Sequence, residues 1–370
     1  MNIALVHDWL TGMRGGEKVL EVLCDLYPAA DILTLLHVPG SVSPRIERHR
    51  IRTSLIQRLP RSRTQYRQYL PLFPFAIEQF NLDRYDLVIS SSHCVAKAVV
   101  VPPRTHHLCY CHSPMRYAWD QFDAYFGAAR VGSTRSRWIY RPMLSRLARW
   151  DAATAPRVHR FVANSRHVAS RILRYYGRDA SVVHPPVDTD FYCPASVPPE
   201  DHFLIVSALV PYKRIDLAIE SCRRAGASLR IVGNGPDRDR LERQAGATVA
   251  FLGQVTDEQI RDEYRRARAV ILAGEEDFGI VPVEAQACGC PVVALGRGGA
   301  LETVIDGETG ACFGEPTVDS LVEALNRVVS LRLVPARIRQ HATQFSRERH
   351  AEQIRDLVAN TLTYPPETRW

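Results

Sequence analysis

The sequence has no apolar run that reaches the roughly 18 residues needed to span a bilayer. Its first residues, MNIALVHDWL, carry no basic region ahead of the apolar run, so we expect no secretory signal. The nine cysteines are an odd number without framework spacing, which predicts reduced thiols and a cytoplasmic location. These absences argue against an integral membrane protein and against a disulfide scaffold.

Motifs for a metal, a dinucleotide or a nucleic acid are also missing. No carboxylate pair stands at the end of a predicted strand, and the C-x-C at 288–290 has no second pair to complete a zinc site. The glycines after the first apolar run lack the G-x-G-x-x-G spacing. No RRM, KH or zinc-finger pattern occurs. We therefore expect no metal, no cofactor and no nucleic-acid partner.

The composition is that of an ordinary globular protein. Hydrophobic residues make up 46% and charged residues 24% of the chain. At 370 residues the chain exceeds a comfortable single core, so two domains are expected. The net charge of +7 and the pI of about 9.0 suit a phosphate-rich ligand or an anionic membrane, without choosing between them.

The most informative stretch, residues 269–295, predicts a strand, a loop, a helix and a second strand. Residues 269–273 are a short apolar run, typical of a buried parallel strand. Residues 274–279 are too polar and glycine-rich to continue it, and a helix is expected from Ile280, with Pro282 in its first turn. Such a loop is a suitable anion site, because free N–H groups and the positive end of the helix dipole point at it.

Two glutamates of this stretch, Glu276 and Glu284, are separated by seven residues that include Phe278, Gly279 and Pro282. This pattern resembles the E-x7-E signature of the retaining family-4 glycosyltransferases, which have the GT-B fold. The resemblance implies that Glu276 contacts the sugar of a nucleotide-diphospho-sugar donor. It also implies that Glu284 holds the ribose and that the loop amides hold the diphosphate. Alternatively, the acidic loop is a solvated turn and Glu284 is a surface residue of the helix.

A second part of the family pattern follows the strand predicted at 203–208. Lys213 and Arg214 lie in the next loop, which resembles the R-x4-K motif whose two cations hold the diphosphate. Ala208 stands where the arginine is usual, and Arg214 is the candidate to compensate. The alternative for Lys213 is a surface lysine in a βα loop.

Two glycines at predicted strand ends match the family as well. Gly233 opens a G-x-G-P turn, and Gly253 ends a strand that approaches the nucleobase in relatives. The resemblance assigns the donor to residues from both halves of the chain. They are Gly15, Gly16, Lys213, Arg214, Gly233, Gly253, Glu276, Phe278, Gly279, Ile280, Val281 and Glu284.

The first half begins with an apolar run at 2–6, a glycine-rich loop and a helix expected from Glu17, which is a doubly wound opening. Gly15 and Gly16 lie in this loop, which resembles the family's first βα loop at the diphosphate; a tight turn is the alternative.

A strand predicted at 106–111 leads to His112, and the loop that begins there resembles the family loop whose histidine contacts the transferred sugar. A lone histidine is more often structural. By resemblance, the catalytic residues are His112, Glu276 and Lys213.

Residues 45–67 form a basic segment with one acid, Glu47, and interleaved apolar residues. Its arginines are Arg45, Arg48, Arg50, Arg52, Arg58, Arg61, Arg63 and Arg67. A basic amphipathic segment suits the head-group layer of an anionic membrane, so peripheral attachment to the inner face is one expectation. A solvated basic surface is the other.

These features predict an α/β fold of two Rossmann-like domains facing a cleft, the GT-B arrangement. The expected parts are an acceptor-side domain at 1–186, a nucleotide-sugar donor domain at 187–345, and a C-terminal helix at 346–370 that packs back on the first domain and ends in a tail.

The implied enzyme is a retaining, metal-independent hexosyltransferase of surface-polysaccharide synthesis. By resemblance, it transfers mannose from GDP-mannose to a glycan or a lipid-linked acceptor. The alternatives are a UDP-sugar-dependent transferase such as a glucosyltransferase, a nucleotide-sugar epimerase of the same fold, and a non-catalytic sugar-nucleotide-binding protein. The intact Glu276, Glu284, Lys213 and His112 argue against the last of these, which only Ala208 supports.

Overall fold

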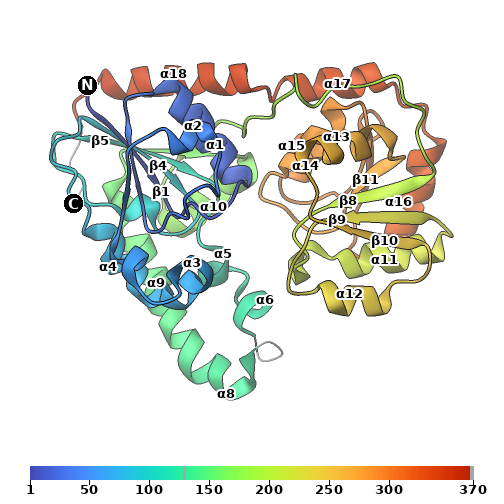
Figure 1. The fold of residues 1–370 in the computed structure, drawn as a ribbon, viewed down its shortest axis with the longest axis horizontal. Coiled ribbons are helices and arrows are strands. Elements are labelled where there is room, and N and C mark those ends of the chain that lie inside the picture. The colour runs from blue at the N-terminus through green and yellow to red at the C-terminus, as the bar shows by residue number, and fades with distance from the viewer. Residues whose placement is uncertain (128–130, 367–370) are drawn as a thin grey trace. The chain divides into compact units, whose positions relative to one another are not determined.

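The computed structural model describes residues 1–127 and 131–366, which form two compact units. The first unit contains residues 1–186 and the chain from residue 348 onward, and the second contains residues 187–347. Each unit has its own sheet and its own helices (Figure 1). This confirms the predicted α/β class with two parallel-sheet domains, while the cleft between them stays a prediction. No helix of the described residues is long and apolar enough to cross a membrane.

The sheet of the first unit has seven parallel strands in the order β3-β2-β1-β4-β5-β6-β7. The strands are β1 (Ile3–His7), β2 (Asp31–Thr34), β3 (Ile51–Thr53), β4 (Leu87–Ser92), β5 (His106–Cys111), β6 (Arg160–Ala163) and β7 (Ala180–Val182). From β1 the chain adds β2 and β3 toward one edge of the sheet, and from β4 it adds β5, β6 and β7 toward the other edge. The direction in which strands are added therefore reverses between β1 and β4. Open α/β sheets bind ligands at the carboxyl ends of strands beside such a reversal, so the loops after β1, β4 and β5 are the expected ligand edge.

The helices of the first unit include a long C-terminal helix that returns to this sheet. They are α1 (Gly15–Leu26), α2 (Pro44–Glu47), α3 (Ser62–Gln65), α4 (Phe73–Glu78), α5 (Arg116–Trp119), α6 (Phe122–Phe126), α8 (Ser133–Arg135), α9 (Arg141–Ala153), α10 (Arg166–Tyr176) and α18 (Arg347–Leu362). Ile354 and Val358 of α18 are buried in one core cluster with Leu5 of β1. The last helix is therefore part of the first unit's core.

The sheet of the second unit has six parallel strands in the order β10-β9-β8-β11-β12-β13. The strands are β8 (His202–Val206), β9 (Ser228–Val232), β10 (Val249–Gly253), β11 (Ala269–Leu272), β12 (Val292–Leu295) and β13 (Gly310–Phe313). Here the reversal lies between β8 and β11, which are hydrogen-bonded neighbours. The loops after these two strands therefore leave adjacent strand ends.

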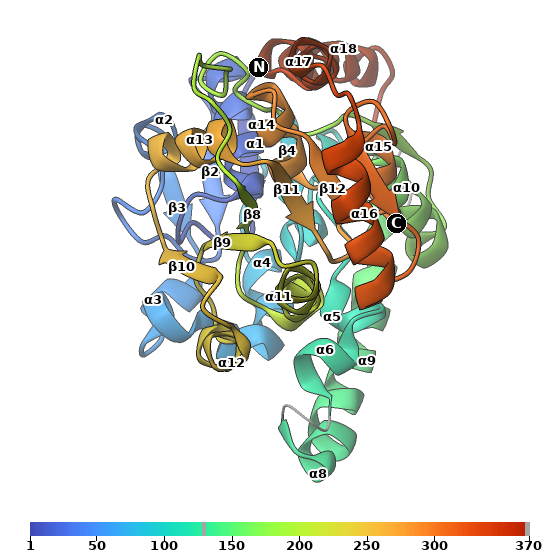
Figure 2. The same cartoon turned by 90° about the vertical axis from the view of Figure 1, so that its right-hand side faces the viewer.

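Helices flank this second sheet as well (Figure 2). They are α11 (Ile215–Arg224), α12 (Arg238–Gln244), α13 (Asp257–Arg266), α14 (Ile280–Ala287), α15 (Ala300–Thr303), α16 (Val318–Ser330) and α17 (Pro335–Thr343). Apolar side chains of the strands alternate between two core clusters: Phe203 and Ile205 of β8 lie in one cluster, and Leu204 lies in the other. The sheet is thus buried on both faces, as the near-continuous apolar runs of its strands require.

A buried histidine of β5, His107, has hydrogen bonds that fit a neutral ring. Its Nδ1 lies 3.0 Å from the carbonyl oxygen of Arg157, which can only accept, so Nδ1 carries the proton. Its Nε2 lies 2.8 Å from the hydroxyl of Ser90. Burial lowers the pKa of His107 to about 3.

This buried histidine is expected to make the protein less stable in acid. The unfolded chain takes up the proton near pH 6.5, and the folded chain only near pH 3. The free energy of unfolding should therefore fall as the pH drops through this window, by up to about 1.4 kcal/mol per pH unit for this one group. Urea titrations at several pH values measure the slope. The His107→Gln variant should have a shallower slope, and equal slopes in the two proteins would contradict the assignment.

Candidate functional site

The adjacent strand ends of the second unit bring Lys213 and Glu276 together. Lys213 lies in the loop after β8, and Glu276 lies in the loop after β11. The ammonium group of Lys213 donates to the carboxylate of Glu276. The side chains are 21% and 10% exposed, so the pair is largely shielded but still open to a ligand.

Two glycines let the backbone approach closely enough to form this pair. A Cβ on Gly274 would lie 2.3 Å from the carbonyl oxygen of Tyr212, so any side chain there would push the Glu276 loop away from Lys213. On the other side, the N–H of Gly299 donates to the carbonyl of Glu276 at 2.8 Å. A Cβ on Gly299 would lie 2.3 Å from the Cα of Phe278. The loop is thus fixed between two neighbouring backbone segments.

The loop ends at the N-terminus of α14. Gly279 is the N-cap, has φ +85°, and has no side chain that could cap the helix. The N–H groups at Ile280 and Val281 lie in the open first turn, where both residues are half-buried. Phe278, by contrast, is buried in the core and anchors the loop. This helix end can receive an anion through its backbone amides and its dipole.

Glu284 lies in the body of α14 and is only 4% exposed, so it is not a surface residue. The hydroxyl of Tyr264 donates to its carboxylate at 3.1 Å. Burial, and then the charge of Glu284, raise the pKa of Tyr264 well above its usual value, so the phenol keeps its proton. The acidic loop is not a solvated turn either, because Glu276 is 8% and Asp277 is 6% exposed.

The remaining donor candidates of the second unit lie at neighbouring strand ends. Arg214 has φ +51°, and its Nε lies 3.5 Å from the carboxylate of Asp216. The N–H of Gly233 donates to the carbonyl of Gly253 at 2.7 Å, which joins the ends of β9 and β10. Ala208 is exposed just after β8, where the family has an arginine. Lys213 is therefore the cation that the structure pairs with Glu276.

In the first unit, α1 begins at Gly15, two residues before the predicted start. The helix starts early because the N–H of Arg14 donates to the carboxylate of Glu17 at 3.0 Å, which caps the first turn. Gly15 and Gly16 therefore lie in that turn and not in a loop. A Cβ on Gly16 would lie 3.4 Å from the ring of His7 and 3.6 Å from Nε2 of His112. The helix N-terminus thus lies against both imidazoles.

His112, directly after β5, ends a row of neighbouring side chains from β4, β1 and α1, which are joined by two hydrogen bonds and one ionic contact. Its Nε2 lies 2.8 Å from the hydroxyl of Ser91 on β4, and that hydroxyl lies 3.1 Å from Nδ1 of His7 on β1. Nε2 of His7 lies 3.6 Å from the carboxylate of Glu17 on α1. The Ser91 hydroxyl has one proton, so it donates to one imidazole and accepts from the other.

The electrostatics of this row favour a neutral His112 beside an ionised Glu17. Burial, and then the neighbouring His93 and His7, lower the pKa of His112 well below its usual value. Burial alone would raise the pKa of Glu17, but its interactions with His7, with His93 and with a backbone N–H together lower it. A neutral imidazole can donate a hydrogen bond through one ring nitrogen while its other nitrogen accepts one from Ser91.

Asp8 is a site residue that the sequence reasoning missed. It is fully buried after β1, and its carboxylate accepts four backbone N–H bonds from residues 93–96 at 2.7–2.9 Å. It thereby fixes the loop after β4. His7, Ser91 and Glu17 were missed as well. The sequence signal for Asp8 was the position of a charged residue just after the apolar run predicted to be a buried central strand.

Two protein-family models match this chain. The model for Glycosyltransferase Family 4 covers residues 13–191, and that for Glycosyl transferases group 1 covers residues 194–345. The chain belongs to the family-4 glycosyltransferases. The resemblance predicted from the E-x7-E pattern is thereby confirmed.

Curated relatives match over part of their length. A GDP-mannose-dependent alpha-(1-6)-phosphatidylinositol monomannoside mannosyltransferase of Mycolicibacterium smegmatis is 32% identical over 197 residues, which are 45% of this chain and 52% of that protein. A D-inositol 3-phosphate glycosyltransferase of Gordonia bronchialis is 31% identical over 224 residues, 50% of this chain and 49% of that protein. The chain thus spans about half the length of the curated relatives it matches.

Solved structures share the fold. HepE of Anabaena in complex with UDP-glucose has a TM-score of 0.71 at 18% identity and covers 97% of this chain and 100% of that chain. The lipopolysaccharide outer core galactosyltransferase WaaB has a TM-score of 0.66 at 15% identity, with coverages of 97% and 99%. These likenesses show that the chain has the GT-B fold.

The basic segment at 45–67 is not an amphipathic surface. It is divided among α2, β3, the 3₁₀ turn Leu55–Arg58 and α3. Ile56 is fully buried, and Leu55 and Leu59 pack against the same core. The apolar side chains therefore face inward and do not share a surface with the arginines, while attachment of this segment to an anionic membrane stays a prediction.

Several arginines of that segment have acidic partners from other elements. Arg45 and Arg48 each lie 3.1 Å from the carboxylate of Asp25, and Arg52 lies 3.8 Å from that of Asp31. The segment itself contains one acid, Glu47, and these carboxylates come from residues outside it. What remains exposed is a polar basic surface.

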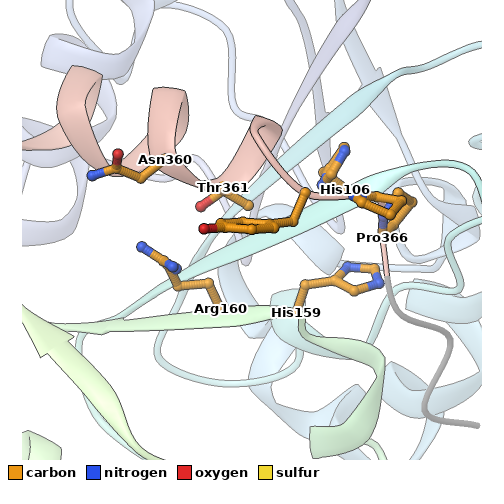
Figure 3. Close-up of a pocket in the computed structure, with 8 residues that line it drawn as sticks. His106, His159, Arg160, Asn360, Thr361 and Pro366 are labelled. Carbon is orange, nitrogen blue, oxygen red and sulfur yellow. The ribbon is translucent and has the colours of Figure 1, made fainter.

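A separate pocket lies at the other end of the first sheet (Figure 3). Its volume is about 190 Å³, and it is lined by residues of β5, β6, α18 and the following tail. His106 and Arg160 are the first residues of their strands, whereas His112 follows the last residue of β5. The pocket is therefore not part of the candidate site. Among the described residues, no group of three metal-ligating side chains is present.

Proposed function

We propose that this glycosyltransferase is a retaining enzyme that transfers mannose from GDP-mannose to a glycan or a lipid-linked acceptor in surface-polysaccharide synthesis. The observation that carries the proposal is the Lys213–Glu276 pair at the reversal between β8 and β11, directly before the open N-terminus of α14. One cation, one row of backbone amides and one carboxylate are the groups that a diphospho-sugar requires.

In this proposal each group has a defined role. Lys213 and the amides at Gly279, Ile280 and Val281 stabilise the negative charge that develops on the leaving diphosphate. Glu284 accepts hydrogen bonds from the ribose hydroxyls. Glu276 contacts the transferred sugar, and so does the neutral imidazole of His112 in the first unit.

The reaction is proposed to proceed by attack on the same face from which the diphosphate departs. The acceptor oxygen forms a bond to C1 of the sugar as the bond from C1 to the phosphate oxygen breaks. The acceptor proton passes to the departing phosphate oxygen. No protein nucleophile is needed, and Lys213 supports the step by holding the diphosphate.

The choice of mannose and guanine is supported by the 32% identical relative that is named as GDP-mannose-dependent. A UDP-sugar-dependent transferase is the main alternative. Calorimetric titration with GDP and with UDP separates the two, because the base is the only difference between these ligands. Tighter binding of GDP supports the proposal, and tighter binding of UDP overturns it. An epimerase would convert the donor without acceptor, and a binding protein would bind it without turnover.

The proposed stabilisation of the diphosphate needs no divalent ion. We therefore expect the transfer rate in excess EDTA to stay within about twofold of the untreated rate, since Lys213 and the amides supply the positive charge. Initial rates with and without chelator, followed by addition of Mg²⁺ or Mn²⁺, measure this. Loss of activity in EDTA with recovery on adding one of these ions would contradict the prediction.

Ser91 is expected to position His112 and not to contact the donor. Ser91→Ala removes the hydroxyl that links the two imidazoles, and one hydrogen bond contributes about 0.5–1.5 kcal/mol, so kcat should fall roughly two- to tenfold with little change in KM. Ser91→Thr keeps the hydroxyl and serves as the matched control. A shift in the pH dependence of kcat should accompany Ser91→Ala. Unchanged kcat in Ser91→Ala would remove the row from the mechanism.

A further inference from the structure

The first unit carries a helical arm, defined as the described residues between 116 and 153. It consists of α5, α6, α8, a π-helical turn (Ser136–Tyr140) and α9, inserted between β5 and β6. Figures 1 and 2 both show α8 at the end of the arm, away from the sheet of this unit. Leu144 and Leu147 of α9 are buried in the core and anchor the arm. The arm therefore has a fixed base and a projecting end.

The projecting end exposes large apolar side chains. Trp138 is 69% exposed and Ile139 is 55% exposed, both in the π-helical turn. Such turns often occur at functional sites. Leaving a tryptophan and an isoleucine in water forgoes the favourable free energy of burying them, so adjacent exposed residues of this size indicate a binding surface.

The charge around these side chains is mainly positive, and an acid paired with them, Asp123 of α6, is exposed with its carboxylate 3.9 Å from Arg141. Residues 131–149 contain five arginines and no aspartate or glutamate. Arg135, Arg137 and Arg141 are exposed next to Trp138 and Ile139. The guanidinium of Arg137 lies 5.2 Å from the centroid of the Trp138 ring, which keeps charge and ring on the same surface. These five side chains are called the arm tip.

We propose that the arm tip binds the surface of an anionic lipid bilayer. Tryptophan and arginine are the residues that suit the head-group layer, where the ring enters the boundary and the guanidinium contacts lipid phosphate. Each arginine near an anionic surface contributes about 1 kcal/mol, which is about fivefold in affinity. Trp138 and Ile139 supply the apolar contact that residues 45–67 lack, because there the apolar side chains are buried.

Sedimentation of the full-length protein with vesicles tests this proposal. Vesicles of phosphatidylcholine alone are compared with vesicles that also contain phosphatidylglycerol. Binding is expected only to the anionic vesicles and should decrease at high salt. The double variant Trp138→Ser, Ile139→Ser should lose at least about tenfold in affinity, and the triple variant Arg135→Glu, Arg137→Glu, Arg141→Glu should lose about a hundredfold or more.

The matched control is Arg58→Glu, Arg61→Glu, Arg63→Glu, which makes the same change of charge on the other exposed basic surface. It should bind within about threefold of the unmodified protein, since it leaves the apolar contact intact. All substituted residues are exposed, so melting temperatures should agree among the variants. Brominated lipid should quench tryptophan fluorescence, and Trp138→Phe should remove most of this quenching.

Three results would overturn the proposal. The first is a lack of binding to anionic vesicles. The second is a larger loss in the Arg58, Arg61 and Arg63 control than in the arm-tip variants. The third is a dimer in solution that the Trp138→Ser, Ile139→Ser variant converts to a monomer without any vesicle binding, which would make the arm tip an interface between copies. None of these measurements needs a donor, so their outcome is independent of the proposed transferase activity.

Discussion

Replacing Lys213 with alanine is expected to lower kcat by roughly 10²–10³, the effect of removing one preorganised group from a site of developing charge. In the free protein Lys213 donates to Glu276, so donor binding has to draw the ammonium toward the diphosphate. If this contact strengthens as the phosphate departs, kcat falls more than KM rises. Steady-state rates with GDP-mannose as the varied donor measure both constants.

Controls separate this effect from a loss of folding. Lys213→Ala leaves the largely buried carboxylate of Glu276 without its cation, so some stability is also expected to be lost. Lys213→Arg keeps the charge and should retain part of the activity. Arg223→Ala removes an exposed cation of α11 that pairs with Glu220, and it should leave kcat unchanged. A folded Lys213→Ala protein with kcat within threefold of the unmodified enzyme would remove Lys213 from the mechanism.

Glu284→Ala is expected to weaken nucleotide binding by about 1.5–3 kcal/mol, roughly 10- to 150-fold in Kd, because it removes a charged hydrogen-bond acceptor for the ribose hydroxyls. The carboxylate is buried in α14, so a ribose bound there is shielded from competing water. Calorimetric titration with GDP measures the change.

The hydrogen bond from Tyr264 needs its own control, because Glu284→Ala also leaves the Tyr264 hydroxyl without its acceptor. Tyr264→Phe removes the internal donor and keeps the carboxylate, so its nucleotide affinity should stay within about threefold of the unmodified value. Glu284→Gln keeps the side-chain size and an acceptor for Tyr264 but loses the charge, and should bind nucleotide with intermediate affinity. Equal affinity for GDP in the unmodified, Glu284→Ala and Glu284→Gln proteins would place the ribose elsewhere.

Strands with strong local signals could be predicted from the sequence. The strand predicted at 106–111 has the bounds of β5, and the strand–loop–helix pattern around Glu276 is as expected. Two edge strands, β3 and β13, had no predicted counterpart. β3 is a three-residue edge strand, Ile51–Thr53, within an arginine-rich segment. From the sequence alone, its central residue Arg52 indicates an exposed position and not a strand of the sheet. β13 begins with Gly310, a residue that disfavours strands but fits here because a Cβ would lie 1.9 Å from the carbonyl of Val292.

The side-chain contacts of the candidate site could not be predicted in the same way. His7, Glu17, Ser91 and His112 belong to four different elements, and only the strand order of the sheet brings them together. The orientation of residues 45–67 was missed for a related reason. A sequence pattern shows that apolar and basic residues alternate, but the neighbouring core decides which side of the segment is buried.

The central claim is tested most directly by incubating the protein with GDP-mannose, radiolabelled in the sugar, and membranes of the organism that makes it. The account predicts that label enters an extractable glycan or lipid-linked product in an α-linkage, in equal amount to the GDP released, and that Lys213→Ala slows this transfer by roughly 10²–10³. Consumption of GDP-mannose with the sugar recovered only as an isomer of the donor would contradict it. So would binding of the donor with no turnover under any acceptor condition.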